Sequence, residues 1–317
     1  MPFFFYFCAR MKGETIAIGV AVLWTLSALF FEHAGKRLGS LNLNLIRLVC
    51  AFLMIGITLL ILNGNFIPVH ADRATWWWMS LSGLVGFVLG DYFLFASYTM
   101  ILARFSQLIM TLAPPFAAVF GFFLLGEKMS WIALAGMCLT LTGISISILK
   151  KQNGTSNHRV RMELPVKGVV FALLGALGQG VGIVLSKQGM IAYEKVYSPE
   201  NALYIPLAAT QIRTIIGIVS FALIILFKGG YGDFLRALKD KKALRSSITG
   251  SVFGPYLGVT FSLMAVQHAN TAVASTIMAT VPILILLPEY LFLKRKITWQ
   301  QVVGAVLSVG GVTLFFI

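Results

Sequence analysis

The sequence predicts an all-α polytopic membrane protein in which ten transmembrane helices form two inverted five-helix repeats. The composition, the spacing of the apolar runs and an internal duplication predict this fold. Hydrophobic residues make up 58% of the 317 residues and charged residues only 11%, and the mean hydropathy is +0.87. Soluble domains carry about 25% charged residues, so the composition indicates a chain that lies mainly in lipid.

Ten apolar runs are long enough to cross a bilayer. A spanning helix needs about 20 residues, and a backbone in lipid must satisfy its own hydrogen bonds, so each run should be a helix. Trp76, Trp77 and Trp78 open the third run, as tryptophans at a membrane interface would. The runs cover 14–31, 41–62, 76–98, 105–125, 130–149, 166–190, 203–227, 247–266, 271–292 and 299–316.

The longest polar stretch, 150–165, separates two halves of five runs each. We therefore expect a first repeat over 1–149, a linker loop over 150–165 and a second repeat over 166–317. Residues 1–11 are expected to be a short extension. Their apolar part is too short to span the bilayer and has no basic region ahead of it, unlike a signal peptide.

The two halves are related by duplication. A shift of 168 positions aligns 83–149 with 251–317 without a gap, and Arg47 corresponds to Arg213 at a shift of 166. Because five is an odd number, the second half enters the membrane in the opposite sense, as in many secondary transporters. The identical pairs include Gly86 with Gly254, Gly90 with Gly258, Pro114 with Pro282, Trp131 with Trp299, Gly136 with Gly304 and Gly143 with Gly311.

One stretch of the first half has a distinctive order of features, LIMTLAPPFAAVFGFFLLGEKMSWIALAGMCLTLTGISI. It contains a helix with a central Pro114, a turn at Gly126-Glu127, and a fifth span rich in small residues, with Gly136 and Gly143. In these features the chain resembles the drug/metabolite transporter superfamily, of the ten-span EamA type. The resemblance covers nearly the whole chain.

The second half departs from this pattern, because Lys294-Arg295 replaces Gly126-Glu127. A role that needs both glutamates is therefore not expected. The resemblance implies a central cavity lined by spans one to four and six to nine, with spans five and ten at the periphery. It also implies transport without ATP hydrolysis, in line with the absence of a P-loop motif from the sequence.

We therefore expect a multi-pass secondary active transporter of the cell membrane (plasma or inner), working by alternating access. The expected activity is export (efflux) of small organic metabolites such as amino acids or nucleosides. One alternative is a membrane-embedded enzyme acting on lipid-linked substrates, which would need a cluster of His, Asp, Ser or Cys near one interface; none is visible. The other is a non-transporting scaffold, which would not need internal symmetry.

Charged residues within a span are costly, so each is a functional candidate. Asp91, well inside the third run, is a candidate for proton coupling or for binding a cationic substrate group. The alternatives are a structural ion pair with an arginine such as Arg47, or a position near a watery cavity mouth. Arg47 and Arg213 can bind a substrate carboxylate in a bidentate way, or can reach headgroups or cap helix ends instead.

Uncharged polar residues recur along the runs. An aromatic-lined cavity with a few amides suits small organic substrates. Each such residue alone is more often a helix-packing hydrogen bond, worth about 0.6 kcal/mol. The candidates for lining the cavity are Trp24, Ser27, Tyr92, Tyr98, Gln107, Gln179, Gln211, Tyr256 and Gln267.

Proline and glycine predict local features of the helices. Pro114 and Pro282 remove backbone hydrogen bonds, so helix kinks are expected at equivalent places in both halves. Gly126 and Glu127 form a turn in which Glu127 should accept backbone donors or pair with a lysine. Glycines crowd the sixth and eighth spans, where close helix packing is favoured over hinge bending; they are Gly175, Gly178, Gly182, Gly250, Gly254 and Gly258.

The remaining charge and the cysteines point to no further ligand. The net charge is +14, but Lys and Arg lie in the gaps between apolar runs, so nucleic-acid binding is not expected. Cys8, Cys50 and Cys138 have no paired spacing, and the four histidines are scattered, so neither a metal site nor a cofactor is expected. The expected partners are the lipid bilayer and a small-molecule substrate, with protons as the candidate coupling ion; the oligomeric state is not determined.

Ten spans place both chain ends on the same side of the membrane. When Lys187 and Lys167, near the two ends of the sixth run, are counted with the adjoining loops, Lys and Arg number 6 on that side and 17 on the opposite side. The positive-inside rule therefore places the ends outside, whereas the family resemblance implies cytoplasmic ends. We favour the charge count, because the difference is wide and the loops are short.

Overall fold

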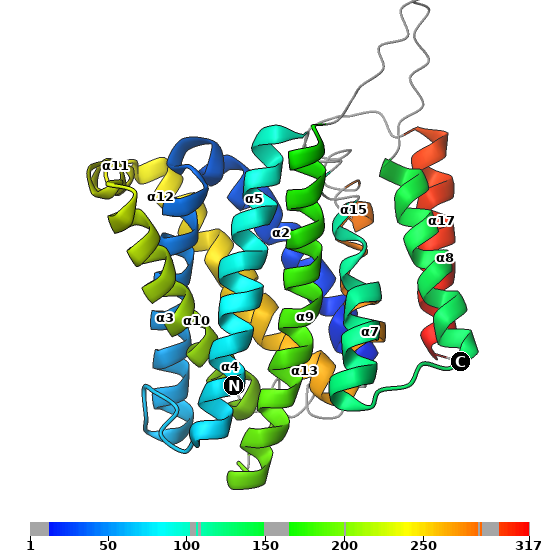
Figure 1. Ribbon diagram of the computed structural model, residues 1–317, viewed down its shortest axis with the longest axis horizontal. Helices are drawn as coiled ribbons and strands as arrows, with labels where there is room; N and C mark the ends of the chain where they lie inside the picture. Colours follow the sequence, from blue (N-terminus) through cyan, green and yellow to red (C-terminus); the bar gives the residue numbers. More distant parts are fainter. Residues whose placement is uncertain are drawn as a thin grey trace, which may run out of the picture.

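The computed structural model describes residues 13–101, 106, 109–148, 165–199, 201–284, 286 and 298–316. These residues form helices joined by short connections, and no strand occurs in the ranges just given. Figure 1 shows the helices as one bundle in which segments from both halves alternate. The all-α fold class is confirmed.

The helices of the first half follow the predicted runs. The third span is one continuous rod of three segments, of which the middle one is a π-helix. The helices are α2 (Gly13–Leu38), α3 (Ser40–Asn63), α4 (Arg73–Ser82) continued by η1 (Gly83–Gly90) and α5 (Asp91–Met100), α7 (Ala113–Leu125) and α8 (Trp131–Ile148).

The second half repeats this order. Its eighth span again contains a π-helix, and a short helix not expected from the sequence lies in the loop before it. The helices are α9 (Val166–Val196), α10 (Tyr204–Phe227), α11 (Tyr231–Ala237), α12 (Lys241–Ser251) continued by η2 (Val252–Gly258) and α13 (Val259–His268), α14 (Thr271–Met278), α15 (Val281–Leu284), and α17 (Trp299–Thr313) with the 3₁₀ turn η3 (Leu314–Phe316).

Seven of these helices are long and apolar enough to cross a membrane, counted over the described ranges. Three shorter apolar helices, Ala113–Leu125, Trp131–Ser147 and Thr271–Leu284, coincide with the fourth, fifth and ninth predicted runs. Together they account for the ten spans. Residues 285 and 287–292 of the ninth run, and residues 105, 107 and 108 of the fourth, lie outside the described residues.

Two irregularities recur at equivalent places in the halves. The π-helices η1 and η2 match at the shift of 168, and η2 contains Pro255, which has no backbone N–H to donate. The fourth and ninth spans each break at a two-residue turn, 111–112 and 279–280. Pro114 and Pro282 lie in the first turn of the segment that follows. Both prolines thus begin a helical segment, where a missing N–H is tolerated.

The fifth and tenth spans demonstrate the inverted symmetry. A Cβ on Gly143 would lie 2.6 Å from the Gly304 carbonyl, and one on Gly136 would lie 2.9 Å from the Gly311 carbonyl. The repeat symmetry maps one contact onto the other, because Gly143 is equivalent to Gly311 and Gly136 to Gly304. Thr140, which donates to the Ser308 carbonyl at 3.3 Å, meets its own equivalent. α8 and α17 run in opposite directions at one edge of the bundle (Figure 1).

Glycines also bring the central helices together across the repeats. A Cβ on Gly178 would lie 2.8 Å from Gly90 Cα, so the sixth span touches the π-helical part of the third. A Cβ on Gly258 would lie 2.6 Å from Trp24, so the eighth span touches the first in the equivalent way. Close helix packing therefore explains these glycines.

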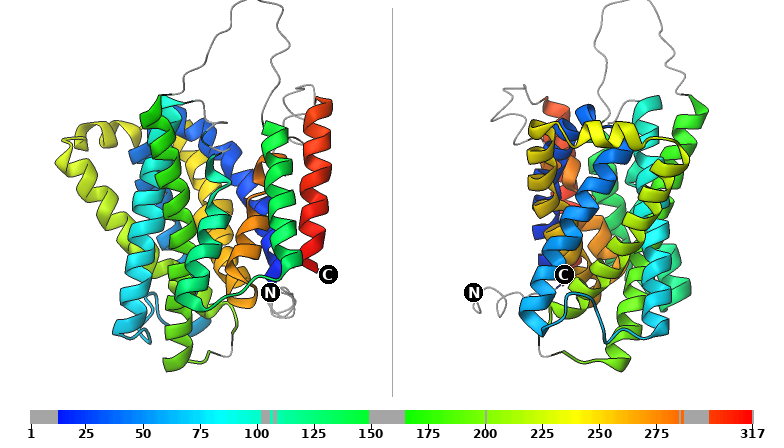
Figure 2. Two further views of the ribbon diagram at one scale, coloured as in Figure 1. Left: turned by 45° about the vertical axis from the view of Figure 1, so that its right-hand side comes forward. Right: turned by 90° about the vertical axis from the view of Figure 1, so that its left-hand side faces the viewer.

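The two ends of the bundle differ in composition. α2 begins and α17 ends at the same end of the bundle, which we call the termini face (Figures 1 and 2). The short helix α11 and its basic connection to α12 lie at the opposite face. Trp131 and Trp299, which begin α8 and α17, are 86% and 78% exposed, as anchors at the two membrane interfaces would be.

Candidate functional site

Four polar side chains from both repeats meet inside the bundle. We call Arg47, Asp91, Gln179 and Arg213 the central charged cluster; they come from the second, third, sixth and seventh spans. Asp91 is only 7% exposed and Arg213 only 5%. Burying charge is tolerated when it is paired and hydrogen-bonded, so the partners within the cluster decide what each member can do.

Asp91 has one partner from each repeat. Its Oδ2 accepts a hydrogen bond from Arg47 Nη2, and its Oδ1 accepts from Gln179 Nε2 at 2.8 Å. The Nε of Arg47 donates to Asn44 Oδ1 at 2.7 Å. Arg47 and Asp91 therefore form the ion pair that the sequence left open as the structural alternative.

The π-helix η1 places Asp91 and receives Gln179. Asp91 begins α5 directly after η1 ends, and Gln179 also donates to the Gly86 carbonyl inside η1 at 3.2 Å. A Cβ on Gly90 would lie 3.1 Å from Gln179 Nε2, so glycine leaves the room that the amide occupies. π-Helical turns occur frequently at functional sites.

Arg213 is held differently from its equivalent, Arg47. Its Cζ lies 4.3 Å from the centroid of the Phe87 ring, and its Nη2 faces Gly86, where a Cβ would be 3.1 Å away. Its buried Nε has no hydrogen-bond partner among the described residues. Within that same part of the chain, no carboxylate oxygen lies within 4.0 Å of its nitrogens. Arg213 thus neither reaches headgroups nor caps a helix.

Several other candidates take part in helix packing. Tyr256 and Thr58 share a hydrogen bond of 2.8 Å between their hydroxyls, which joins the eighth span to the second. Gln211 Nε2 donates to the Phe52 carbonyl at 3.2 Å, while its Oε1 is buried without a partner among the described residues. Each bond links one repeat to the other.

The aromatic candidates and Ser27 lie outside the cluster. Trp24 and the buried Ser27 pack against Gly258 and Gly254. The ammonium nitrogen of Lys228 lies 5.2 Å from the centroid of the Tyr92 ring. The side chain of Tyr98 and the whole of Gln107 lie outside the described residues.

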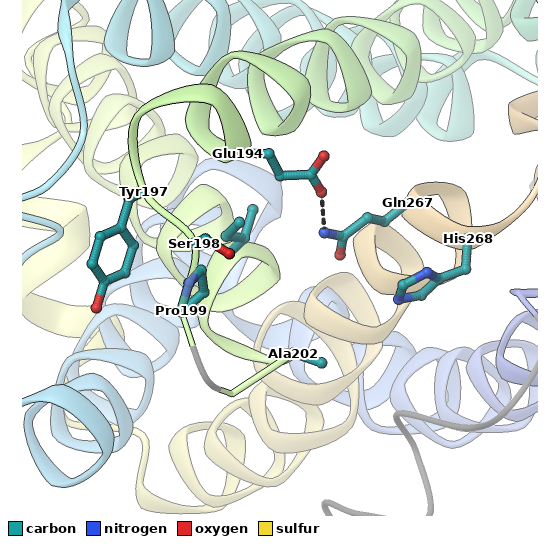
Figure 3. Close-up of a pocket in the computed structure, with 8 residues that line it drawn as sticks. Glu194, Tyr197, Ser198, Pro199, Ala202, Gln267 and His268 are labelled. Carbon is teal, nitrogen blue, oxygen red and sulfur yellow. Dashed lines mark hydrogen bonds between the residues drawn. The ribbon is translucent and has the colours of Figure 1, made fainter.

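One described cavity, of about 340 Å³, opens at the termini face. Glu194, Tyr197, Ser198 and His268 are among its lining residues, and Gln267 donates to Glu194 across it (Figure 3). All its lining residues belong to α9, α10, α13 and the α9–α10 connection. The cavity therefore lies within the second half, and the cavity expected between the halves stays a prediction.

A second ion pair joins the repeats at the termini face, and we call Glu127, Lys187 and Thr271 the inter-repeat latch. Lys187 Nζ donates to Glu127 Oε1 at 2.6 Å and to the Ala269 carbonyl at 2.6 Å. The Thr271 backbone N–H donates to Glu127 Oε2 at 2.8 Å. Because Thr271 begins α14, the carboxylate also lies at the positive end of that helix.

The turn at Gly126 positions this carboxylate. Gly126 has φ 66°, in the left-handed region that ends a helix most easily at glycine. The Glu127 N–H donates to the Gly121 carbonyl at 3.1 Å, and a Cβ on Gly121 would lie 3.1 Å from Glu127 Oε2. The side chain therefore turns inward beneath α7 instead of into water.

Lys187 was not among the candidate residues predicted from the sequence. It lies inside the sixth apolar run, where a charge is as costly as it is at Asp91, so it could have been identified in the same way. Thr58 and Asn44 carry no such signal, because a hydroxyl or an amide in a span is common. Among the described residues, no group of three or more His, Cys, Asp or Glu could hold a metal ion.

The comparisons with known proteins agree with this architecture. The chain is 28% identical to Protein LicB of Haemophilus influenzae over 187 residues, which are 57% of this chain and 59% of LicB. It is 36% identical over 75 residues to an uncharacterized transporter of Buchnera aphidicola subsp. Schizaphis graminum, covering 23% of this chain and 24% of that protein. The matches thus span less than two thirds of either relative.

Fold and family comparisons extend over the whole chain. A protein of known crystal structure superposes with a TM-score of 0.72 over 96% of both chains at 16% identity, which is a likeness of fold alone. The model of the EamA-like transporter family matches residues 11–149 and 166–317. Because this match includes both halves, the chain belongs to the EamA-like transporter family and is a multi-pass membrane protein.

Proposed function

We propose that the protein is a secondary active transporter that exports small organic metabolites, such as amino acids or nucleosides, by alternating access. The central charged cluster carries the proposal. It is buried, it takes residues from both inverted repeats, and it lies next to a π-helix. Inverted-repeat transporters bind their substrates at such an interface near the bilayer midplane.

The inter-repeat latch supports an alternating mechanism. Glu127 of the first repeat is bound to Lys187 and Thr271 of the second, so separation of the repeats at the termini face must break these bonds. The equivalent sequence positions in the second half are Lys294 and Arg295, with no glutamate. The two faces would therefore open by breaking different contacts, with the termini face closed in the conformation described.

Asp91 is the candidate site for a coupling proton. A proton on Asp91 would remove the charge that Arg47 and Gln179 bind, and so would loosen a contact between the repeats. If protons drive transport through Asp91, then Asp91→Asn should abolish the response of transport to a pH gradient. Full gradient-driven flux in this variant would remove Asp91 from the coupling mechanism.

Transport itself is tested in proteoliposomes. The purified chain is reconstituted, and entry of labelled amino acids and nucleosides is followed with and without a pH gradient and with unlabelled substrate inside. If the protein is a carrier, unlabelled substrate inside the liposomes should accelerate the entry of labelled substrate, because the binding site returns to the outside with internal substrate bound. Equal entry into protein-free liposomes for every compound would contradict a carrier.

The latch offers a second test of the mechanism. Glu127→Gln leaves Lys187 without a carboxylate and weakens the bond to the Thr271 N–H, so amide hydrogen exchange over 269–274 should accelerate. Glu194→Gln, on the same face and bound to Gln267 within the second half, is the matched control and should leave that exchange unchanged. Equal exchange in both variants would contradict a latch at Glu127.

A further inference from the structure

An uncompensated positive charge lies in the middle of the bundle. The central charged cluster contains two guanidinium groups and one carboxylate, and that carboxylate is bound to Arg47. Arg213 has no anion within 4.0 Å among the described residues, and the carboxylate of Asp91 attracts it only from a longer distance. A buried charge without a partner is costly, and in a membrane protein it marks a functional site by default.

The duplication shows where the missing anion would be expected. Arg213 is the equivalent of Arg47, but the equivalent of Asp91, 168 positions on, is Val259. The second half therefore kept the arginine and has no carboxylate at the matching place. A ligand that carries a carboxylate would supply the group that the first half supplies from its own chain.

The surroundings of Arg213 leave its donors available. Phe87 covers one face of the guanidinium at 4.3 Å, so the plane is held. The Nε on its edge is buried and has no hydrogen-bond partner among the described residues, and Nη2 fits against Gly86, where a Cβ would lie 3.1 Å from it. A guanidinium edge with two free donors matches a carboxylate in a bidentate pair.

The depth of Arg213 separates this ligand from lipid. Arg213 is the tenth of the 24 residues of α10, about 14 Å of helix from its first residue at a rise of 1.5 Å per residue. A headgroup phosphate at either interface is therefore remote. A small solute that enters the bundle can reach this depth by the route that transport itself requires.

We propose that Arg213 binds the carboxylate of the transported substrate, which makes the substrate a small organic acid or amino acid rather than a nucleoside. This inference rests on the proposed function, because it assigns the substrate class of the same site. Arg47 does not compete for the substrate carboxylate, because it is already paired with Asp91, which Gln179 also binds. Arg213 alone would then receive it.

Ligand-induced thermal stabilisation of the full-length protein in lipid nanodiscs tests the assignment. The probes are the L-amino acids, their amides and uridine, each titrated against the unfolding temperature. A ligand that binds only the folded state raises that temperature as its concentration increases. We expect at least one amino acid to do so, and its amide, which lacks the carboxylate, to produce no shift.

Variants distinguish binding from a structural role. Arg213→Gln should lose the ligand-induced shift, yet should unfold at the same or a higher temperature than the wild type without ligand, since it removes an uncompensated charge. Arg213→Lys should retain a reduced shift. Arg37→Gln, at an exposed arginine bound to Asp240, should keep the full shift.

Three outcomes would overturn the assignment: no carboxylate in the panel stabilises the wild type, an amide stabilises as well as its acid, or Arg213→Gln keeps the shift. Proteoliposome uptake separates this result from the proposed function. If uridine is the only compound taken up, the protein is a carrier but the carboxylate site is contradicted. If a ligand binds through Arg213 but no compound is taken up, the site is supported and the transport function is contradicted.

Discussion

Asp91 connects the two repeats through single side chains. Arg47 approaches it from its own repeat and Gln179 from the other, so the carboxylate holds charge and geometry together inside the bundle. In a region of low dielectric such a pair contributes little net stability, but removal of one partner leaves the other unpaired. The loss of stability when one partner is removed therefore reports how deeply the ion pair is buried.

The Arg47–Asp91 pair should show strong coupling in a double-mutant cycle. Asp91→Asn should lower stability by about 3–5 kcal/mol, because Arg47 is left buried without its anion. The double variant Arg47→Gln/Asp91→Asn should recover part of that loss, since neither charge remains. Unfolding temperatures and denaturant midpoints of the four chains measure the coupling, and simple additivity would show that water screens the pair.

Outside the membrane, Asp240 provides a pH-dependent contact. Donation from Arg37 at 2.6 Å and from the Ala243 N–H lowers the pKa of Asp240 below its ordinary value of about 3.9. A lowered folded-state pKa means that the stabilisation is present above about pH 4 and is lost as the pH falls through the folded pKa.

Asp240→Asn should therefore flatten the acid limb of stability. Between about pH 5 and pH 3 the unfolding temperature of the wild type should fall more steeply than that of the variant, because protonation of Asp240 breaks its contact with Arg37. Asp233→Asn, on the neighbouring α11, is the control and should follow the wild type. Parallel curves for wild type and Asp240→Asn would show that this contact contributes nothing.

At the scale of elements, close approach of backbones determines which helices pair. The fifth and tenth spans meet through glycines at equivalent positions, and the sixth and eighth spans meet the third and first in the same way. Helices in lipid lack a hydrophobic drive towards one another, so small residues that allow tight van der Waals contact take its place.

Gly143→Ala should destabilise the protein, while Gly310→Ala should not. The new Cβ at Gly143 would lie 2.6 Å from the Gly304 carbonyl, which is rigid backbone, whereas nothing lies within 4 Å at Gly310. Overpacking of this kind costs about 1–3 kcal/mol. Unfolding temperature compares the two single variants, and an equal temperature would mean that α8 and α17 separate easily.

For the whole molecule, sequence divergence between the inverted repeats makes the two faces chemically unequal. The termini face has the inter-repeat latch, while the opposite face carries the basic loop around α11. The first described helix, α2, begins on the side where the last, α17, ends, so one orientation decides the side of every described loop. The charge count predicts that the basic loop lies in the cytoplasm.

A membrane-impermeant maleimide can determine this orientation. In a chain without its native cysteines, Gly232→Cys on α11 should react only after the cells are permeabilised, because the basic loop is expected inside. Ala74→Cys, exposed at the start of α4, should react in intact cells. The reverse pattern would place the termini in the cytoplasm and would show that the family pattern outweighs the charge count.

The sequence predicted more of the fold than of the candidate site. Apolar runs locate helices because lipid leaves the backbone no other solution, so the spans were predicted, with described helix ends up to seven residues from the expected ones. The π-helices η1 and η2 were not predictable, since a shifted hydrogen bond leaves no mark in hydrophobicity. Arg47, Asp91 and Gln179 were each singled out, but their sequence positions, far apart, could not show that they meet.

The sequence by itself determined the class of the protein, the ten spans and the inverted duplication, because hydrophobicity, odd span number and repeated residues are properties of order along the chain. Only the tertiary structure decided that Asp91 binds Arg47 while Arg213 stays unpartnered, and that Glu127 reaches Lys187 and Thr271. Those outcomes depend on helix rotation and register, which glycine contacts between distant segments set and which no local pattern records.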